Sequence, residues 1–217
     1  MVNINTRSIR EQVADVLRMR IISGELKPGD RISERDISRE LNISTTPIKE
    51  AIRGLETAGL LITLPRKGTM VSEFAKQNLS QLSTLRSALE GVAANLAAEN
   101  MDEDAVKRLE LLLDETEGLI DSDNVGQVES FNREFHETIT KYSNNQYLIQ
   151  LIETQRSFNQ GFRHGGLRER DGREQSLQEH RAILDAVKAG NRELAETLMR
   201  NHIRRSAEYV LDNIETI

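Results

Sequence analysis

The sequence predicts a mostly α-helical protein of two domains. We expect an N-terminal winged helix-turn-helix with a small β-hairpin wing over residues 1–74, and a C-terminal all-α helical bundle over residues 75–217. Two observations predict this class. Apolar residues recur every three or four positions along most of the chain, which is the period of an amphipathic helix. Strand-like alternation is confined to two short runs, residues 61–64 and 69–72.

The first predicted helix has an apolar stripe and a clear end. The stripe consists of Ile9, Val13, Val16, Leu17, Ile21 and Ile22. Gly24 and the pair Pro28-Gly29 end the helix, because glycine favours the conformation that follows a helix C-terminus and proline cannot continue a helix. Ser33 then caps a second short helix, which we expect from Glu34 to Leu41.

The third predicted helix begins within Leu41–Ile52, LNISTTPIKEAI. Pro47 opens it, because proline at a first helical position loses no hydrogen bond. The preceding hydroxyls can cap the free amides or donate to a phosphate, and they belong to Ser44, Thr45 and Thr46. Lys49 and Arg53 lie four residues apart and share one face of this helix. A short helix with a polar tip and a basic face is typical of a recognition helix in the DNA major groove.

A basic hairpin follows the third helix. The strand-like runs at 61–64 and 69–72 are joined by Pro65-Arg66-Lys67-Gly68, so Arg66 and Lys67 stand at the tip. This order of elements predicts a winged helix-turn-helix. A winged helix that contacts only proteins is the alternative, but cations on both the recognition helix and the wing favour DNA.

The charge is divided unevenly along the chain. The net charge is −6, which alone argues against a nucleic-acid-binding protein. Residues 1–74 nevertheless carry 12 Lys+Arg against 10 Asp+Glu, whereas the remainder carries 17 against 25. The acidic half would therefore face away from the duplex. The chain has no cysteine, and it has neither a signal-like start nor an apolar run of membrane-spanning length, so we expect a cytoplasmic protein that does not bind membranes.

The second half of the chain shows the helical period throughout. Six helices are predicted, centred on residues 79–96, 109–120, 128–139, 147–158, 177–187 and 191–213. Gly190 ends the fifth and Asn191 caps the sixth. Gly161–Gly172 is expected to be a loop, and Glu73–Asn78 a short linker between the domains.

Three of the four histidines lie on apolar stripes of separate predicted helices. They are His136, His180 and His202, and Asn132 precedes His136 by one helical turn. Each could be a core histidine whose ring nitrogens are hydrogen-bonded. Together they could instead converge on one divalent cation, with the Asn132 amide supplying an oxygen ligand.

The N-terminal half resembles a known family. The stretch LRMRIISGELKPGDRISERDISRELNISTTPIKEAIRGLETAGLLITLPRKGTMV is similar to the DNA-binding domain of the GntR family of bacterial transcription regulators. The resemblance implies that Arg35 and Lys49 reach base edges. It also implies that phosphate or the minor groove is contacted by Thr46, Arg66 and Lys67.

This resemblance implies a repressor that acts as a homodimer on a short palindromic operator of double-stranded DNA. The sequence departs from the family pattern at Thr45, where an arginine is common, and at Lys49, which stands in the place of another arginine. An arginine can bind guanine through two hydrogen bonds and a threonine cannot, so the family's operator preferences transfer only loosely.

The C-terminal half resembles the FCD domain, the effector-binding half of the FadR branch, in its six-helix VanR-like form. The resemblance rests on LRSALEGVAANLAAE, FNREFHETITKYSNNQYL, EHRAILDAVKAGN and MRNHI. Metal-binding members use an acid and a histidine four residues apart, plus one histidine on each of two later helices. These positions fall on Asn132, His136, His180 and His202. Because Asn132 replaces the usual aspartate, zinc or nickel is favoured over magnesium, with manganese possible.

The resemblance also implies an effector, a small carboxylic or sugar acid. Arg86 lies one turn before Glu90, and family members place such an arginine near the pocket, where it can bind a carboxylate. A surface ion pair between these two residues is the alternative. Two other functions remain open: a metal-free regulator that binds a larger apolar ligand, such as an acyl thioester, and a metal-dependent hydrolase. Glu134 and Glu137 should point away from the ligand face, so no general base is evident and we expect no enzyme.

Overall fold

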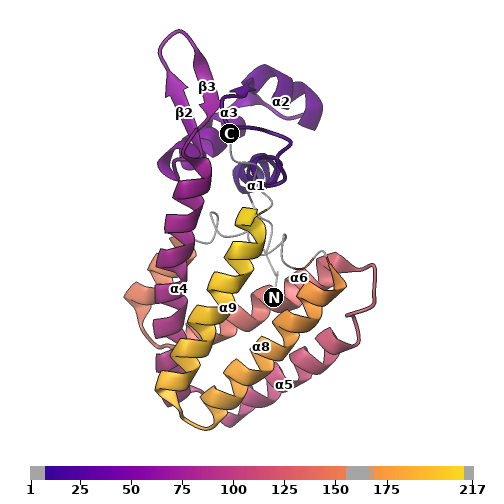
Figure 1. The fold of residues 1–217 in the computed structure, drawn as a ribbon, viewed down its shortest axis with the longest axis vertical. Helices are drawn as coiled ribbons and strands as arrows, with labels where there is room; N and C mark the ends of the chain where they lie inside the picture. Colours follow the sequence, from indigo (N-terminus) through magenta and orange to yellow (C-terminus); the bar gives the residue numbers. More distant parts are fainter. Residues whose placement is uncertain (1–7, 155–166, 168, 213–217) are drawn as a thin grey trace. The chain divides into compact units, whose positions relative to one another are not determined.

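Contacts divide the chain into two compact units: Ser83–Val210 form one, and the residues up to Leu82 together with those from Leu211 on form the other. The structure is a computed structural model that describes residues 8–154, 167 and 169–212 (Figure 1). The boundary falls several residues after the one predicted at residue 74, inside a helix that the two units share.

The N-terminal unit is a winged helix-turn-helix, as the sequence predicts. Its elements are α1 (Ile9–Ile22), β1 (Arg31–Ile32), α2 (Glu34–Leu41), α3 (Thr45–Thr57), β2 (Leu61–Leu64), β3 (Gly68–Val71) and the first two turns of α4. The wing sheet has three antiparallel strands in the order β1-β3-β2. The sequence predicted β2 and β3 but missed β1, because a strand of two residues is too short to show alternation. β1 forms by pairing Arg31 with Met70 of β3.

Helix α3 begins two residues earlier than predicted. Pro47 is its third residue, which costs no hydrogen bond either, because the first four amides of a helix have no intrahelical partner. Ser44 is the N-cap, and its side chain makes no capping hydrogen bond. Asn42 ends α2 in the left-handed conformation, with φ of 52°, and so turns the chain sharply into α3.

Helix α4 (Ala75–Asn100) starts inside the segment that was predicted to link the two domains, so most of that segment is helical. Ala75 and Leu79 are buried in the N-terminal unit, and the Asn78 side chain donates a hydrogen bond of 2.8 Å to the Gly59 carbonyl. Gly59 has φ of +67°, and a Cβ atom there would lie 2.4 Å from Asn78 Nδ2. These contacts make the first turns of α4 part of the N-terminal unit.

The described regular structure of the C-terminal unit is entirely helical. Its elements are most of α4, α5 (Glu103–Glu117), α6 (Val125–Tyr142), a helix described over residues 146–154, α8 (Arg170–Lys188) and all but the last two residues of α9 (Arg192–Asp212). The predicted helix at 147–158 and the predicted loop Gly161–Gly172 lie partly outside the described residues. Where the loop prediction can be compared, α8 begins at Arg170 and so shortens it.

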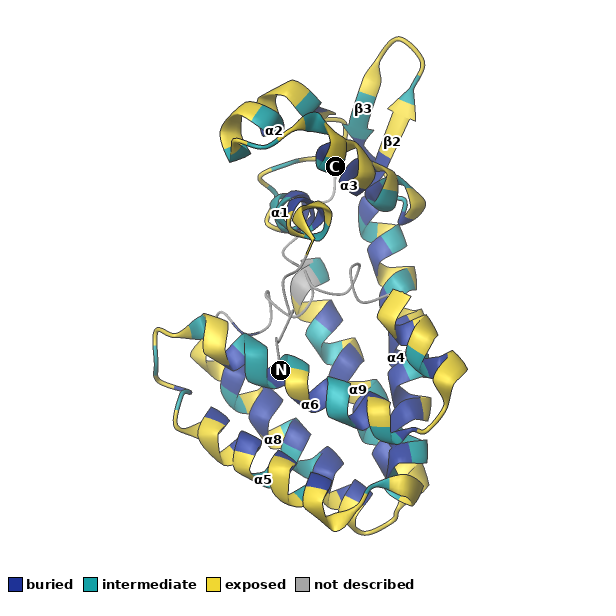
Figure 2. Cartoon of the chain, turned by 180° about the vertical axis from the view of Figure 1, so that it is seen from behind, coloured by how far each residue is buried: buried dark blue, intermediate teal, exposed yellow. Residues whose placement is uncertain are grey.

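One apolar core holds α4, α5, α6, α8 and α9 together. Phe135, Ile139, Ile183 and Met199 are fully buried at its centre. Figure 2 shows the pattern along the helices, each with a buried side and an exposed side. Among the described helices, none combines the length and the apolar content needed to cross a lipid bilayer.

Candidate metal centre and DNA-binding face

Three histidines meet in the core of the C-terminal unit. His136 comes from α6, His180 from α8 and His202 from α9, and each is no more than 3% exposed. Their ligand nitrogens all lie within 4.8 Å of one another. The Nε2 atom of His202 is 3.2 Å from that of His180 and 3.3 Å from that of His136. The structure therefore brings together three residues that are distant in sequence and could hold a metal ion.

Packing holds the histidine rings in place. The His180 ring stacks on Phe135, with ring centroids 4.1 Å apart and an angle of 14° between the planes. His136 Nδ1 lies 2.7 Å from Glu90 Oε2, and His202 Nδ1 lies 2.7 Å from Glu179 Oε2. In both cases the nitrogen that faces the carboxylate is the one that points away from the cluster.

The cluster favours neutral imidazoles. Burial lowers the pKa of His180 well below its ordinary value, and the nearby His202 and His136 lower it further. Burial also lowers the pKa of His202, although Glu179 acts in the opposite direction. Neutral imidazole is the form that binds a metal ion. At neutral pH, therefore, neither His180 nor His202 has to release a proton before a metal ion binds.

Arg86 and Glu90 are buried, with only 4% and 2% of their side chains exposed, so they are not a surface ion pair. Arg86 Nε donates to Glu90 Oε1 over 2.7 Å. Glu90 therefore links Arg86 on α4 to His136 on α6, and both predicted effector residues lie beside the histidine cluster.

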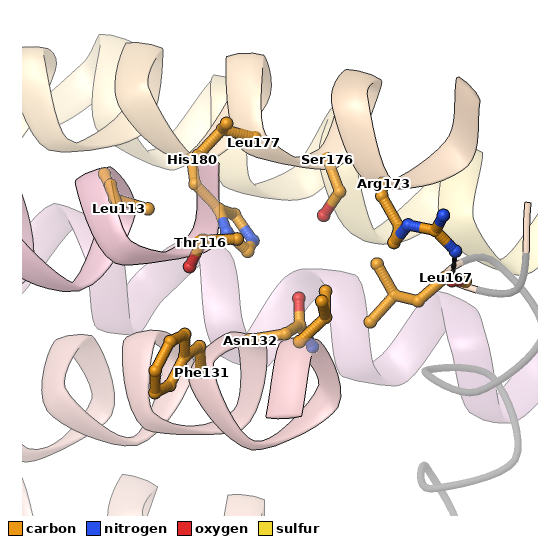
Figure 3. A pocket seen from close by; sticks show the side chains of 10 residues that line it. Leu113, Thr116, Phe131, Asn132, Leu167, Arg173, Ser176, Leu177 and His180 are labelled. Atoms are coloured by element: carbon orange, nitrogen blue, oxygen red, sulfur yellow. Dashed lines mark hydrogen bonds between the residues drawn. The ribbon is translucent and has the colours of Figure 1, made fainter. Parts of the chain in front are cut away.

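Asn132 lines the same cavity as His180. The cavity measures about 10 Å³, the space of one water molecule, and Figure 3 shows it between α5, α6 and α8. Its other polar side chains are Thr116, Arg173 and Ser176. Arg173 is buried, and it donates from Nε to the Ile120 carbonyl and from Nη1 to the Leu167 carbonyl. Arg173 was not predicted as a site residue, although it lies seven residues before His180 and so on the same helical face.

Two further residues of the site were not predicted. Glu179 precedes His180 in the sequence, and it accepts hydrogen bonds from both His202 and Arg205. Burial acts to raise the pKa of Glu179, but these hydrogen bonds outweigh it and leave the pKa lowered. Arg205 follows His202 by three residues on α9, which is the only sequence signal for its role.

The predicted DNA-binding residues lie in the N-terminal unit, and all but one are exposed. Thr45, the exception, is half-buried. Arg35 belongs to α2, and Ser44 is the residue just before α3. Arg66 and Lys67 lie in the turn between β2 and β3. The remaining four belong to α3: Thr45, Thr46, Lys49 and Arg53. Lys49 Nζ lies 3.8 Å from Glu34 of α2. The structure thus presents cations on the helix and turn that a winged helix uses for DNA.

A winged helix with exposed cations, joined to a helical domain with a buried polar site, defines the class of DNA-binding transcription regulators. Comparison with family models identifies the family. Residues 9–71 match the gntR family of bacterial regulatory proteins, and residues 81–205 match the FCD domain. The chain belongs to the GntR family of transcription regulators and carries an FCD domain.

Known proteins agree with this assignment. The transcriptional regulator YdhC of Bacillus subtilis is 30% identical over 94% of this chain and 92% of its own length. The probable D-xylose utilization operon transcriptional repressor of Paenarthrobacter nicotinovorans is 30% identical over 90% of this chain and 86% of its own length. The solved structure of McbR/YncC from E. coli has a similar fold, with a TM-score of 0.69, 24% identity, and coverage of 97% of this chain and 100% of that chain. These domains and relatives are regulators, not enzymes.

Proposed function

We propose that this regulator is a homodimeric repressor whose DNA binding is controlled by a small carboxylic or sugar acid bound at a metal ion. Residues 1–74 would bind a short palindromic operator, and residues 75–217 would bind the metal ion and the effector. The observation that carries the proposal is the convergence of three buried imidazoles in the domain that accompanies an exposed basic winged helix.

The spacing of the ring nitrogens supports a metal ion. Two nitrogens that each lie about 2.0–2.1 Å from a tetrahedral zinc ion are about 3.3–3.4 Å apart. Two of the three Nε2 separations, from His202 to His180 and from His202 to His136, are 3.2 and 3.3 Å here, and the ligand nitrogens of all three residues lie within 4.8 Å of one another. His136, His180 and His202 would hold the ion, with the Asn132 amide as an oxygen ligand. This nitrogen-rich set favours zinc or nickel, with manganese as a weaker choice, and the bound ion would supply open positions for an anionic oxygen.

Arg86 supports an acid as the effector. Its Nε is used by Glu90, whereas its terminal nitrogens make no hydrogen bond to the described residues. We assign those nitrogens to the carboxylate of the effector, with Glu90 holding the guanidinium in place. A larger apolar ligand is disfavoured, because the site consists of three buried imidazoles with a buried arginine and a buried glutamate beside them, and an acyl chain would leave these polar groups without partners.

The exposed cations of the N-terminal unit support operator binding. Arg35 and Lys49 would contact base edges, and Arg53, Arg66 and Lys67 would contact phosphate or the minor groove. The hydroxyls at the start of α3 would donate to phosphate: Ser44, whose side chain is not used as a cap, together with Thr45 and Thr46.

A face of α4 supports dimerisation. Between Lys76 and Glu99 the helix contains two charged residues, Arg86 and Glu90, and both are buried. Leu85 and Val92 are 45% and 38% exposed on this helix. An uncharged face with exposed apolar side chains can pair with its own copy without like-charge repulsion, as a two-fold interface requires. Two copies would place two recognition helices on the two halves of a palindrome.

The test is elemental analysis of protein purified without a metal-affinity tag, combined with a thermal-shift screen of small carboxylic and sugar acids. Near-stoichiometric zinc, nickel or manganese is expected, together with stabilisation by one acid that disappears after chelation. Absence of metal and of any acid response would reject the metal-dependent effector site. The DNA-binding assignment would then be decided separately, by measuring operator binding.

A further inference from the structure

The histidine cluster is flanked by two similar chains of charged residues. In one, Arg86 donates to Glu90, and Glu90 lies against His136. In the other, Arg205 donates to Glu179 from Nε over 2.5 Å and from Nη2 over 2.8 Å, and Glu179 contacts His202 over 2.7 Å. Each carboxylate is thus neutralised by an arginine, so neither adds net charge to the cluster.

These contacts determine which ring nitrogen carries the hydrogen. A neutral imidazole has one N–H group, and a ring nitrogen that makes a 2.7 Å hydrogen bond to a carboxylate oxygen must be the donor. Nδ1 of His202 makes this contact with Glu179, so the hydrogen of His202 sits on Nδ1. The Nε2 atom of His202 then carries a lone pair, and it points at the Nε2 atoms of His180 and His136 over 3.2 and 3.3 Å, the position where a cation would bind.

We propose that Glu179, held by Arg205, is a positioning residue that keeps His202 in the tautomer required for metal binding. This inference rests on the proposed metal site, and it adds to that site a residue that would not touch the ion. The alternative is a purely structural role, in which Glu179 only ties α8 to α9 through Arg205.

Glu179 can be tested without unfolding the site. Its side chain is 26% exposed and borders a groove of about 280 Å³, which is also lined by Gln178, Ala182, Leu198 and Asn201. Water in this groove can solvate Arg205 when Glu179 is replaced. Glu90 offers no such route, because it is buried and its removal would leave the buried Arg86 without its carboxylate.

The experiment compares Glu179→Gln and Glu179→Ala with a control, Glu117→Gln, in the full-length metal-free protein. Glu117 is a good control because it contacts Arg181 of α8 over 3.0 Å, in an exposed ion pair outside the cluster. Long-range ¹H–¹⁵N spectra of the imidazoles report the tautomer of His202. Competition with a chromophoric chelator then gives the Kd for Zn²⁺.

In the wild type and in Glu117→Gln, His202 is expected to carry its hydrogen on Nδ1. In Glu179→Ala the hydrogen should move to Nε2 or be shared, and the Zn²⁺ affinity should fall by about 10–100-fold. Glu179→Gln should lie between them, because an amide oxygen still accepts a hydrogen bond but carries no charge.

An unchanged His202 tautomer in Glu179→Ala overturns the proposal, whatever happens to the Zn²⁺ affinity. A structural role alone would lower the melting temperature and leave the tautomer in place. If the wild-type protein binds no Zn²⁺, the metal part of the proposed function fails, and the tautomer measurement still decides whether Glu179 positions His202.

Discussion

Replacing His180 by alanine tests whether the cluster binds metal. The substitution removes one of three nitrogen ligands and also a fully buried ring that stacks on Phe135. Loss of the ring leaves a cavity, which should lower the free energy of unfolding by about 2–4 kcal/mol. His180→Phe serves as the matched variant, since a phenyl ring keeps the stacking partner and removes the nitrogens.

The metal-dependent part of the effect can be worked out separately. At a metal concentration of about 100 times Kd, binding stabilises the folded protein by about 2.7 kcal/mol, which for a chain of this size is a rise of about 5–11 °C in melting temperature. Loss of a direct ligand should weaken metal binding about 100-fold or more, because the loss of a residue that only hydrogen-bonds to a ligand already lowers metal affinity about 10–100-fold. At the same metal concentration the remaining stabilisation is then about 0.4 kcal/mol, or about 1–2 °C.

The assay is a thermal-shift measurement of each protein with a chelator and with Zn²⁺ or Ni²⁺, together with its metal content. Both His180 variants should lose the metal-induced shift, whereas only His180→Ala should show the full packing loss in the chelated state. Full metal content and an unaltered metal-induced shift in either variant would refute the ligand assignment of His180.

Three other substitutions test separate parts of the assignment. Asn132→Asp should increase metal affinity by at least about tenfold and improve Mn²⁺ binding, because it adds a negative charge beside the cation; chelator competition measures this, and an unchanged Kd would remove Asn132 from the ligand set. Lys49→Ala should weaken binding to a selected operator by about 1–3 kcal/mol in fluorescence anisotropy. Lys107→Ala, on the exposed side of α5, should leave operator binding unaltered, and equal affinities for all three proteins would exclude Lys49 from the DNA contact. Leu85→Glu should dissociate the dimer in analytical ultracentrifugation, because it places charge on the uncharged face of α4. Leu111→Glu is its control, since Leu111 is 63% exposed on α5, and a dimeric Leu85→Glu variant would argue against the α4 interface.

Long periodic segments were predicted best, and short or paired elements worst. The helices of both halves follow the apolar spacing, because burying one stripe is what stabilises each of them. The strand β1 was missed because its two residues form a strand only through pairing with β3. The beginning of α4 was misplaced for a related reason: Asn78 and Leu79 are held by contacts with the N-terminal unit, and sequence spacing does not reveal such contacts.

The histidines of the site could be selected from the sequence, whereas most of their neighbours could not. His136, His180 and His202 stand out because each interrupts an apolar stripe. Glu179 and Arg205 look like ordinary charged residues on the polar sides of α8 and α9. Their connection to His202 exists only because these two helices pack together, so no spacing within one helix could have predicted it.

The sequence by itself determined the local properties of this protein: its helical periods, the turn that leads into α3, the cations of the winged helix, and the presence of polar residues on apolar stripes. These properties depend on neighbours within a few positions of the chain. The tertiary structure alone decided that three imidazoles meet with Nε2 atoms 3.2 and 3.3 Å apart, and that Arg86 and Glu90 are buried beside them. Such distances arise from how helices far apart in sequence share one core, and local sequence preferences carry no information about that packing.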